Sequence, residues 1–204
     1  MVEMVIEHLE PTLSRWILIE YENAVRLVGR IIITNVKNER DREILSKIAV
    51  VKSERACELY DKAIILDPQA SEELTPEDAD KADVVVIGGI LGDHPPRGRT
   101  KEMLTSTFKN PIARSIGPKQ FSIDGAVFVA HMVLNRGYRL DEIEYVDGII
   151  LRRNVFGVEH TIELPYRYPI VNGRPLISDK LVEMLTTCEV ELFEENVFNR
   201  IKNK

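Results

Sequence analysis

The sequence predicts an α/β protein whose mostly parallel β-sheet is flanked by helices. Short runs of β-branched residues, such as 31–33 and 84–87, have the composition of fully buried strands. Segments with apolar residues at helical spacing separate these runs, and strands that alternate with helices form parallel sheets through βα units. Loops rich in glycine, proline and polar residues follow several strands, as they do at the ligand-binding edge of open α/β sheets.

The length and composition predict one globular domain. The chain has 204 residues, of which 44% are hydrophobic and 29% are charged, which suffices for a sizeable core. The net charge of −6 argues against binding of nucleic acid through a broad basic surface, although it is compatible with a local basic patch.

The cysteines and the apolar runs predict a cytoplasmic protein with no membrane partner. Cys57 and Cys188 lie far apart in the sequence, so reduced thiols are favoured over a disulfide framework. No apolar run approaches the roughly 20 residues needed to span a bilayer. The amino terminus also lacks the pattern of a signal peptide.

The first half of the chain is expected to alternate strands and helices. Short apolar runs predict strands at residues 4–6, 31–33 and 63–66. Helical spacing of apolar residues predicts helices at 15–28, 38–50 and 53–60, with Ser14 as the N-cap of the first and Gly29 as its end. Residues 75–78, TPED, have the hydroxyl, proline and acidic residues of a helix start.

The second half continues this pattern and then changes. A strand at 84–87, a helix at 100–108, a strand at 112–116 and an apolar helix at 125–134 are expected. Beyond residue 141 we expect strands at 148–151 and 161–164, a turn at Asn172-Gly173, a helix from Ser178 through 185, and a final amphipathic helix in the tail. No repeat or clear linker interrupts the chain, so residues 1–204 are expected to form one domain.

Residues 84–101, VVVIGGILGDHPPRGRTK, contain the densest set of chemically versatile side chains. Gly88 and Gly89 would let the backbone approach a ligand closely at the end of a buried strand. Asp93 and His94 would lie at the strand's carboxyl end, where open α/β sheets bind ligands. The alternative is a tight turn with no ligand, but the density of Gly, Pro, Asp, His and Arg favours a site.

Several common catalytic motifs are missing from the sequence. No Gly-Lys-Ser/Thr follows the glycine pair, the glycines do not form G-x-G-x-x-G, and no serine lies in G-x-S-x-G. The four histidines lack the spacing of metal ligands, so no metal site is expected. Three polar loops after strands remain, at 66–69, 88–96 and 117–122, and they could hold a small cofactor mainly through backbone groups.

Three stretches of the sequence resemble one known family. They are IEHLEPTLSRWILIEY near the amino terminus, LDPQASEELTPEDADKADVVVIGGILGDHPPRGRTKE in the middle, and IGPKQFSIDGA at 116–126. They resemble the small SPOUT-superfamily group of predicted S-adenosylmethionine-dependent RNA methyltransferases of archaea and eukaryotes. The characterised eukaryotic member of that group methylates an arginine of a small-subunit ribosomal protein.

The resemblance implies a fold and a cofactor that local patterns cannot show. It implies a C-terminal trefoil knot within about residues 62–140, a smaller C-terminal extension after 141, and S-adenosylmethionine held by three loops of the knot. Asp67 and Ala70 depart from the LSPQG-like first loop of related tRNA guanine methyltransferases. The implied cofactor-binding residues are Leu66, Asp67, Pro68, Gln69, Gly88, Gly89, Ile90, Leu91, Gly92, Asp93, His94, Ile116, Gly117, Lys119, Gln120, Phe121 and Ser122.

Methyl transfer determines which catalytic residues are expected. The sulfonium methyl is already activated, so the enzyme mainly aligns a nucleophile behind it. An arginine acceptor must lose a proton, which a nearby carboxylate can accept. The candidates are Glu7, Asp93 and Asp124, and the alternative role of Asp124 is to cap the following helix.

The substrate-binding candidates are His8, Trp16, Arg97 and Arg99. Arg97, Arg99 and Lys101 could neutralise a phosphate or the cofactor carboxylate, and the alternative is a solvated basic run. Glu20 and Tyr21 are expected to be ordinary polar positions of the first helix.

Three functions fit these expectations. The first is methylation of a protein arginine, because an acidic enzyme suits a cationic substrate. The second is methylation of RNA, in which residues 97–101 and the basic end at 199–204 would contact phosphates. The third is a binding module that holds the nucleotide without transferring a group. The expected partner is a ribosomal protein or an RNA, and the sequence leaves a homodimer and a monomer both open.

Overall fold

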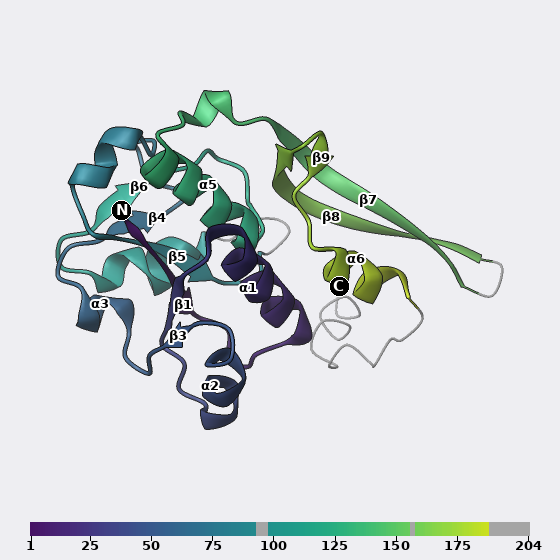
Figure 1. The fold of residues 1–204 in the computed structure, drawn as a ribbon, viewed down its shortest axis with the longest axis horizontal. Helices are drawn as coiled ribbons and strands as arrows, with labels where there is room; N and C mark the ends of the chain where they lie inside the picture. Colours follow the sequence, from purple (N-terminus) through teal and green to yellow (C-terminus); the bar gives the residue numbers. More distant parts are fainter. Residues whose placement is uncertain (93–97, 156–157, 188–204) are drawn as a thin grey trace.

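A six-stranded parallel sheet forms the centre of the molecule (Figure 1), which confirms the predicted parallel arrangement and adds one strand, at residues 50–51, to those expected. The structure, a computed structural model, describes residues 1–92, 98–155 and 158–187. The strand order is β3-β2-β1-β5-β4-β6, so the two longest of these strands lie side by side in the middle. The strands are β1 (Glu3–His8), β2 (Ile31–Thr34), β3 (Val50–Val51), β4 (Ile64–Leu66), β5 (Val84–Gly89) and β6 (Ile112–Arg114).

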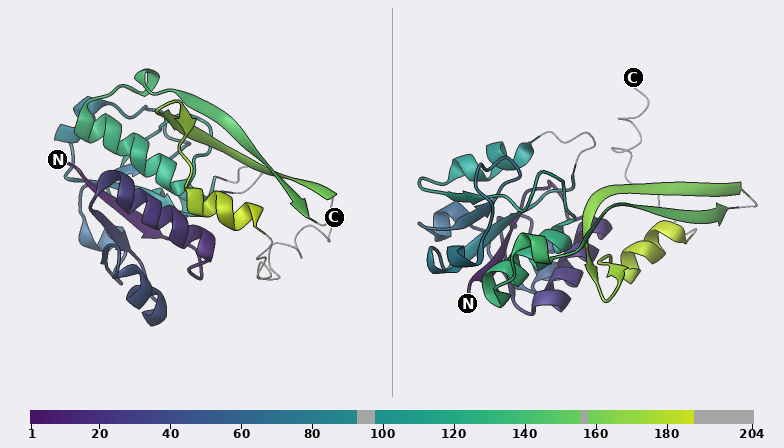
Figure 2. Two further views of the ribbon diagram at one scale, coloured as in Figure 1. Left: turned by 45° about the vertical axis from the view of Figure 1, so that its right-hand side comes forward. Right: turned by 90° about the horizontal axis from the view of Figure 1, so that it is seen from above.

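Helices cover both faces of this sheet. On one face, α1 (Arg15–Val28) and α5 (Ile123–Arg136) lie next to each other (Figure 2), and with α2 (Glu39–Leu45) they bury the largest apolar cluster. On the other face, α3 (Ala56–Leu59) and the segment after α4 (Arg99–Met103) enclose a smaller cluster that contains Val5, Val86 and Leu104. Apolar side chains therefore cover the central strands on both faces, which explains their continuous apolar sequence.

The ends of α1 confirm the sequence prediction. The Ser14 hydroxyl accepts a hydrogen bond from the Ile17 amide, and Gly29 ends the helix at φ +87°. That backbone conformation is accessible to glycine and strained for other residues. The bounds of this helix were encoded locally because both of its caps are residues with strong positional preferences.

Two expected helices are shorter in the structure. The helix expected at 38–50 ends at Leu45, because the chain turns so that Val50 pairs with Ile32 as β3. The helix expected at 53–60 spans only Ala56–Leu59. Sheet pairing prevails over helical propensity in the first of these segments.

Other boundaries differ because tertiary packing prevails over local pattern. The helix expected at 100–108 is divided into α4 and a 3₁₀ turn, η2 (Thr105–Thr107), because Leu104 leaves helical geometry and is fully buried. The TPED start leads into a 3₁₀ turn, η1 (Pro76–Asp80). The strand expected at 112–116 ends at Arg114. The helix expected at 125–134 begins two residues earlier, with the Ser122 hydroxyl as its cap.

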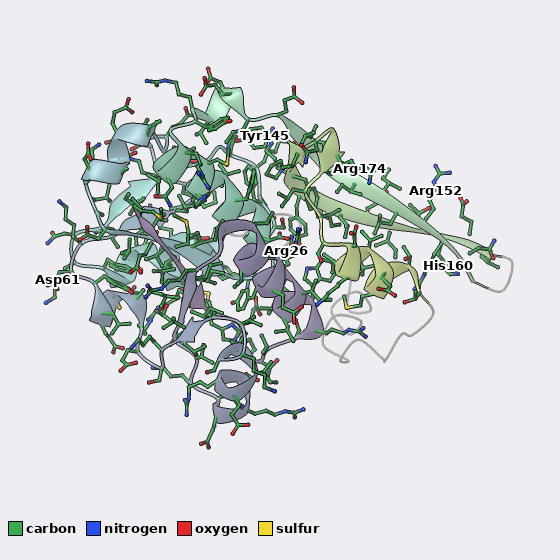
Figure 3. All side chains as sticks on the ribbon, in the orientation of Figure 1. Arg26, Asp61, Tyr145, Arg152, His160 and Arg174 are labelled. Carbon is green, nitrogen blue, oxygen red and sulfur yellow. The ribbon has the colours of Figure 1, made fainter. Side chains whose placement is uncertain are left out.

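A long hairpin follows η3 (Leu140–Glu142) and projects beyond the body of the molecule (Figures 1 and 2). Its strands, β7 (Tyr145–Val155) and β8 (Val158–Val171), are much longer than predicted, because only their apolar centres had a strand-like composition. Leu164 on one face packs against Leu181 and Leu185 of α6 (Asp179–Thr186). Figure 3 shows Arg152 and His160 on the part that extends past α6.

The remaining predictions concern the end of the chain. The turn at Asn172-Gly173 is confirmed, since both residues have positive φ and join β8 to β9 (Arg174–Pro175). The helix after Ser178 is confirmed as α6. The predicted amphipathic tail helix falls on residues 188–204, outside the described residues. Within the described ranges, every helix is too short or too polar to cross a bilayer.

Candidate functional site

A cavity of about 410 Å³ opens where β4, β5 and β6 end. Its walls come from the loops that follow these three strands, together with the start of α4 and Ala126 of α5. A cavity of this size suits a small ligand. Because the sheet is parallel, the carboxyl ends of neighbouring strands bring loops that are distant in sequence to one edge.

Most of the implied cofactor-binding residues line this cavity. Those that do are Leu66, Asp67, Pro68, Gln69, Gly88, Ile90, Gly92, Ile116, Lys119, Gln120 and Phe121. Gly89, Leu91, Gly117 and Ser122 do not line it, and Asp93 and His94 lie outside the described residues. Sequence reasoning missed Ile87, Gly98, Thr100 and Ala126, and it did not single out Pro118, although Pro118 lies within the predicted loop at 117–122. Ile87 directly precedes a predicted loop residue, so a wider window would have included it.

Asp67 gives the first loop its shape. One of its carboxylate oxygens accepts a hydrogen bond from the Gln69 amide at 2.9 Å, and the other accepts from the Thr105 hydroxyl at 2.7 Å. The carboxylate thus closes a tight turn and ties it to η2. Asp67 therefore has a structural role at the wall of the cavity.

Two glycines of the second loop are required by packing. A Cβ at Gly89 would overlap the Tyr21 hydroxyl and lie 2.9 Å from the Glu7 carbonyl oxygen. A Cβ at Gly92 would lie 2.7 Å from the Tyr166 ring and 2.9 Å from the Gln120 side chain. Gly89 thus accommodates α1, and its predicted contact with the cofactor stays a prediction. Gly92 allows the second loop to contact the third loop and β8.

Arg99 fixes the second loop from the wall of the cavity. Its guanidinium donates to the Leu91 carbonyl oxygen at 2.6 Å and lies 3.8 Å from a Glu10 carboxylate oxygen. The same Glu10 oxygen accepts a hydrogen bond from the Leu91 amide. Arg99, predicted to bind substrate, therefore lies among the cofactor loops, while Arg97 is outside the described residues.

The contacts of Glu7 indicate a structural role, and its predicted catalytic role stays a prediction. Its fully buried carboxylate accepts hydrogen bonds from the Thr34 hydroxyl, the Arg55 guanidinium and the Ala56 amide. These contacts hold the start of α3 against the sheet, and Glu7 does not line the cavity. Sequence position alone could not show which way this side chain points.

His8 is also placed away from the cavity. Its Nδ1 lies 3.0 Å from the Tyr21 hydroxyl in a buried contact. Burial lowers the pKa of His8, so the neutral imidazole is favoured. The structure therefore shows His8 and Tyr21 as packed partners, and the predicted contact of His8 with substrate stays a prediction.

Asp124 belongs to a buried acidic pair that the sequence did not indicate. It is not the N-cap of α5, which is Ser122. Its carboxylate accepts hydrogen bonds from the Asn23 side chain at 2.6 Å and the Gly125 amide at 2.9 Å. The second member, Glu20, accepts hydrogen bonds from the Trp16 indole at 2.6 Å and the Ile123 amide at 2.9 Å.

Both carboxyl groups of this pair hold a proton more tightly than exposed carboxyl groups do. Burial, followed by repulsion from Asp124, raises the pKa of Glu20 to about 8. Burial likewise raises the pKa of Asp124. Glu20, expected to be an ordinary helix position, is only 2% exposed. The available sequence signal was its spacing of four residues from Trp16, which places both residues on one face of α1.

Metal ligation finds no support in the described part of the chain. No group of three or more His, Cys, Asp and Glu side chains is arranged there to hold an ion. Two cationic side chains, Arg99 and Lys119, are on the cavity wall together with the Asp67 carboxylate.

The amino-acid sequence matches a family of known enzymes. A family profile described as "Protein arginine N-methyltransferase SFM1-like" matches residues 3–190. Protein arginine N-methyltransferase SFM1 of Saccharomyces cerevisiae is 30% identical over 210 residues, which cover 90% of this chain and 94% of the relative.

Solved structures show the same likeness. Yeast SFM1 complexed with SAH has a TM-score of 0.81 at 30% identity, covering 90% of this chain and 94% of that one. The complex of the same enzyme with SAM has a TM-score of 0.81 at 29% identity, covering 91% and 90%. Trm10 of Thermococcus kodakaraensis, at 18% identity with a TM-score of 0.54 and coverage of 69% and 96%, shares the fold.

Proposed function

Because the chain belongs to the SFM1-like family of protein arginine N-methyltransferases, we propose that it transfers a methyl group from S-adenosylmethionine to an arginine of a protein. The observation that carries this proposal is the cavity at the ends of β4, β5 and β6, built from the three loops that the resemblance implied for the cofactor. The SAM- and SAH-bound structures of yeast SFM1 support the choice of cofactor.

The residues of the cavity fit this cofactor. Leu66, Ile87 and Phe121 offer apolar surface for a nucleoside, and the loops offer backbone donors and acceptors. Lys119 on the cavity wall supplies a cationic group that an amino-acid carboxylate requires. The bound cofactor supplies an activated methyl group, so this chain's own residues have to orient the acceptor and remove its proton.

The substrate is proposed to be a ribosomal protein in the cytoplasm. The net charge of −6 supports this choice, since ribosomal proteins are cationic and opposite charge favours their encounter with the enzyme. The RNA alternative depended on the basic residues 97–101 and on the basic end at 199–204, which lies outside the described residues. One of these, Arg99, is bonded to the Leu91 carbonyl and lies close to Glu10, which makes it less available to phosphates.

A knotted single domain remains part of the proposal. The resemblance implies a trefoil knot within about residues 62–140, and the loops at 66–69, 87–92 and 116–121 converge on one cavity inside that range. The segment after residue 141 packs on α1 through the cluster of Ile19, Leu164 and Leu181, as expected for an extension of the same domain.

Labelled S-adenosylmethionine tests the reaction. The protein is incubated with salt-extracted small-subunit ribosomal proteins and, separately, with ribosomal RNA. We expect label in the protein fraction that is recovered as methylarginine after hydrolysis. Label in the RNA would establish the second function instead. Cofactor binding without label in either fraction would leave the binding module.

A further inference from the structure

Strand β8 contacts both the second and the third cofactor loop. The Tyr166 hydroxyl donates a hydrogen bond to the Gly92 carbonyl oxygen at 3.2 Å, and Gly92 lines the cavity. The next residue, Arg167, donates its backbone amide to the Gln120 carbonyl oxygen at 2.7 Å. Gln120 also lines the cavity, whereas Tyr166 and Arg167 do not. Two consecutive residues outside the cavity therefore hold two of the loops that form its walls.

The contact between Tyr166 and the second loop depends on the absence of a side chain at position 92. A Cβ built on Gly92 would lie 2.7 Å from the Tyr166 ring and 2.9 Å from the Gln120 side chain, so the three residues meet there. Glycine has more backbone conformations available than other residues, so the loop itself does not fix the direction of this carbonyl group. The direction is set from outside the loop, by the Tyr166 hydroxyl.

The neighbouring residue of the second loop is also held from outside. The Leu91 amide donates to a Glu10 carboxylate oxygen at 3.0 Å, and the Leu91 carbonyl oxygen accepts from the Arg99 guanidinium at 2.6 Å. Glu10 follows β1, Arg99 begins α4, and Tyr166 belongs to β8. Three separate elements thus orient the backbone of two successive loop residues. Tyr166 is the contribution of the segment after residue 141.

The Tyr166 ring is fixed by the apolar cluster between the hairpin and α6. It packs against this cluster, which contains Leu164, Tyr168 and Leu181, and it meets the Tyr168 ring edge to face at 6.4 Å. A tyrosine side chain rotates about only two bonds, so packing of the ring also fixes the position of its hydroxyl. The donor to the second loop is therefore held by the hairpin.

Side chains tie the third loop to the base of the same hairpin. The Arg167 guanidinium donates two hydrogen bonds to the Asp147 carboxylate, at 2.6 and 2.9 Å, and its central carbon lies 5.4 Å from the centre of the Tyr145 ring. The Tyr145 ring meets the Phe121 ring of the third loop edge to face at 5.7 Å. Figure 3 shows Tyr145 where the hairpin leaves the body of the molecule. Both strands of the hairpin are therefore connected to the third loop.

These contacts connect the cofactor cavity with the hairpin. We propose that Tyr166 is a positioning residue for the cofactor, because its hydroxyl orients the Gly92 carbonyl and so holds the second loop in the shape that binds. Together with the Arg167 amide on the third loop, it links cofactor binding to the stability of β8. A contact that favours the binding shape is stabilised by the ligand to the same extent, because coupling is reciprocal. This inference rests on the proposed function and adds to it a residue outside the cavity that sets cofactor affinity.

Calorimetry with SAH tests the contribution of the hydroxyl. Tyr166→Phe keeps the ring and removes only the donor to Gly92, so we expect the Kd for SAH to rise about three- to tenfold, the effect of one hydrogen bond. Tyr168→Phe is the matched control, because it removes from the same strand a hydroxyl that has no hydrogen-bond partner in the described structure. The control should bind SAH as the wild type does. Equal affinity of Tyr166→Phe and the wild type overturns the inference.

Hydrogen exchange separates positioning from a merely structural role. In the wild type and in Tyr168→Phe, SAH should slow the exchange of β8 amides, including that of Arg167, about three- to tenfold more than that of α2 amides, which do not line the cavity. In Tyr166→Phe this additional protection should be smaller, whereas exchange without SAH should stay close to that of the wild type. Exchange in β8 that does not respond to SAH, or that responds equally in Tyr166→Phe, overturns the inference.

Steady-state kinetics distinguish this inference from the proposed function. Tyr166→Phe should raise KM for SAM about three- to tenfold and change kcat by less than about twofold, because the contact supports the loop before and during transfer alike. A large fall in kcat with an unchanged KM overturns the inference. Absence of methylarginine with a wild-type protein that binds SAH would remove the proposed function, while calorimetry still decides the positioning role. Absence of SAH binding by the wild type would overturn both.

Discussion

Replacing Glu20 with Gln should change how the stability of the protein depends on pH. In the folded protein the pKa of Glu20 is raised from 4.5 to about 8, mainly by burial and then by Asp124. Between these two pH values the folded state holds a proton that the unfolded state has released. Stability is therefore highest below pH 4.5 with respect to this group and falls as the pH rises toward 8.

The magnitude follows from the same linkage. A single titrating group changes the free energy of unfolding by at most about 1.4 kcal/mol per pH unit. Over the interval from pH 4.5 to 8 this slope amounts to an upper limit of about 5 kcal/mol. Glutamine cannot ionise, so the variant lacks this loss. The wild type minus Glu20→Gln difference in unfolding free energy should therefore fall steadily across the interval.

Urea unfolding at several pH values measures this difference. Taking a difference is necessary because burial lowers the pKa of His8 and His131, which makes stability fall as the pH drops through 6.5, the opposite sign. Glu22→Gln serves as the matched control and should keep the wild-type slope. A difference that stays flat or rises between pH 5 and 8 would refute the assignment of Glu20 as a carboxyl that is neutral at pH 7.

Three further predictions concern the cavity and its supports. Gly89→Ala should destabilise the protein by about 1–3 kcal/mol, because the added Cβ overlaps the Tyr21 hydroxyl. Adding Tyr21→Phe to this variant should partly restore its stability. An unchanged temperature of thermal unfolding in Gly89→Ala would contradict the packing role of Gly89. Glu7→Ala should lower the free energy of unfolding by about 3 kcal/mol or more, because it leaves the Arg55 guanidinium and the Ala56 amide without their buried partner. Methyltransferase activity per folded molecule should persist in this variant. Lys119→Ala should weaken cofactor binding about tenfold in calorimetry, whereas Lys62→Ala, a change outside the cavity, should leave it unchanged.

Local signals in the sequence determined the parallel sheet, the bounds of α1 and the cofactor loops. Ser14 and Gly29 cap α1 through preferences of single residues, and the buried strands show in their β-branched composition. The resemblance located the residues of the three loops. The structure shows that these loops line one cavity. The long hairpin was underestimated because its outer face is polar, and only pairing between its strands defines its length.

Tertiary structure alone decided which carboxyl groups meet. Glu7 and Glu20 are both acidic residues among apolar neighbours, yet one anchors α3 and the other joins Asp124 beside the cavity. The contact between Glu20 and the Ile123 amide spans 103 residues. Periodicity encodes which face of an element is buried, but the pKa of a side chain depends on groups that long-range packing brings within a few ångströms.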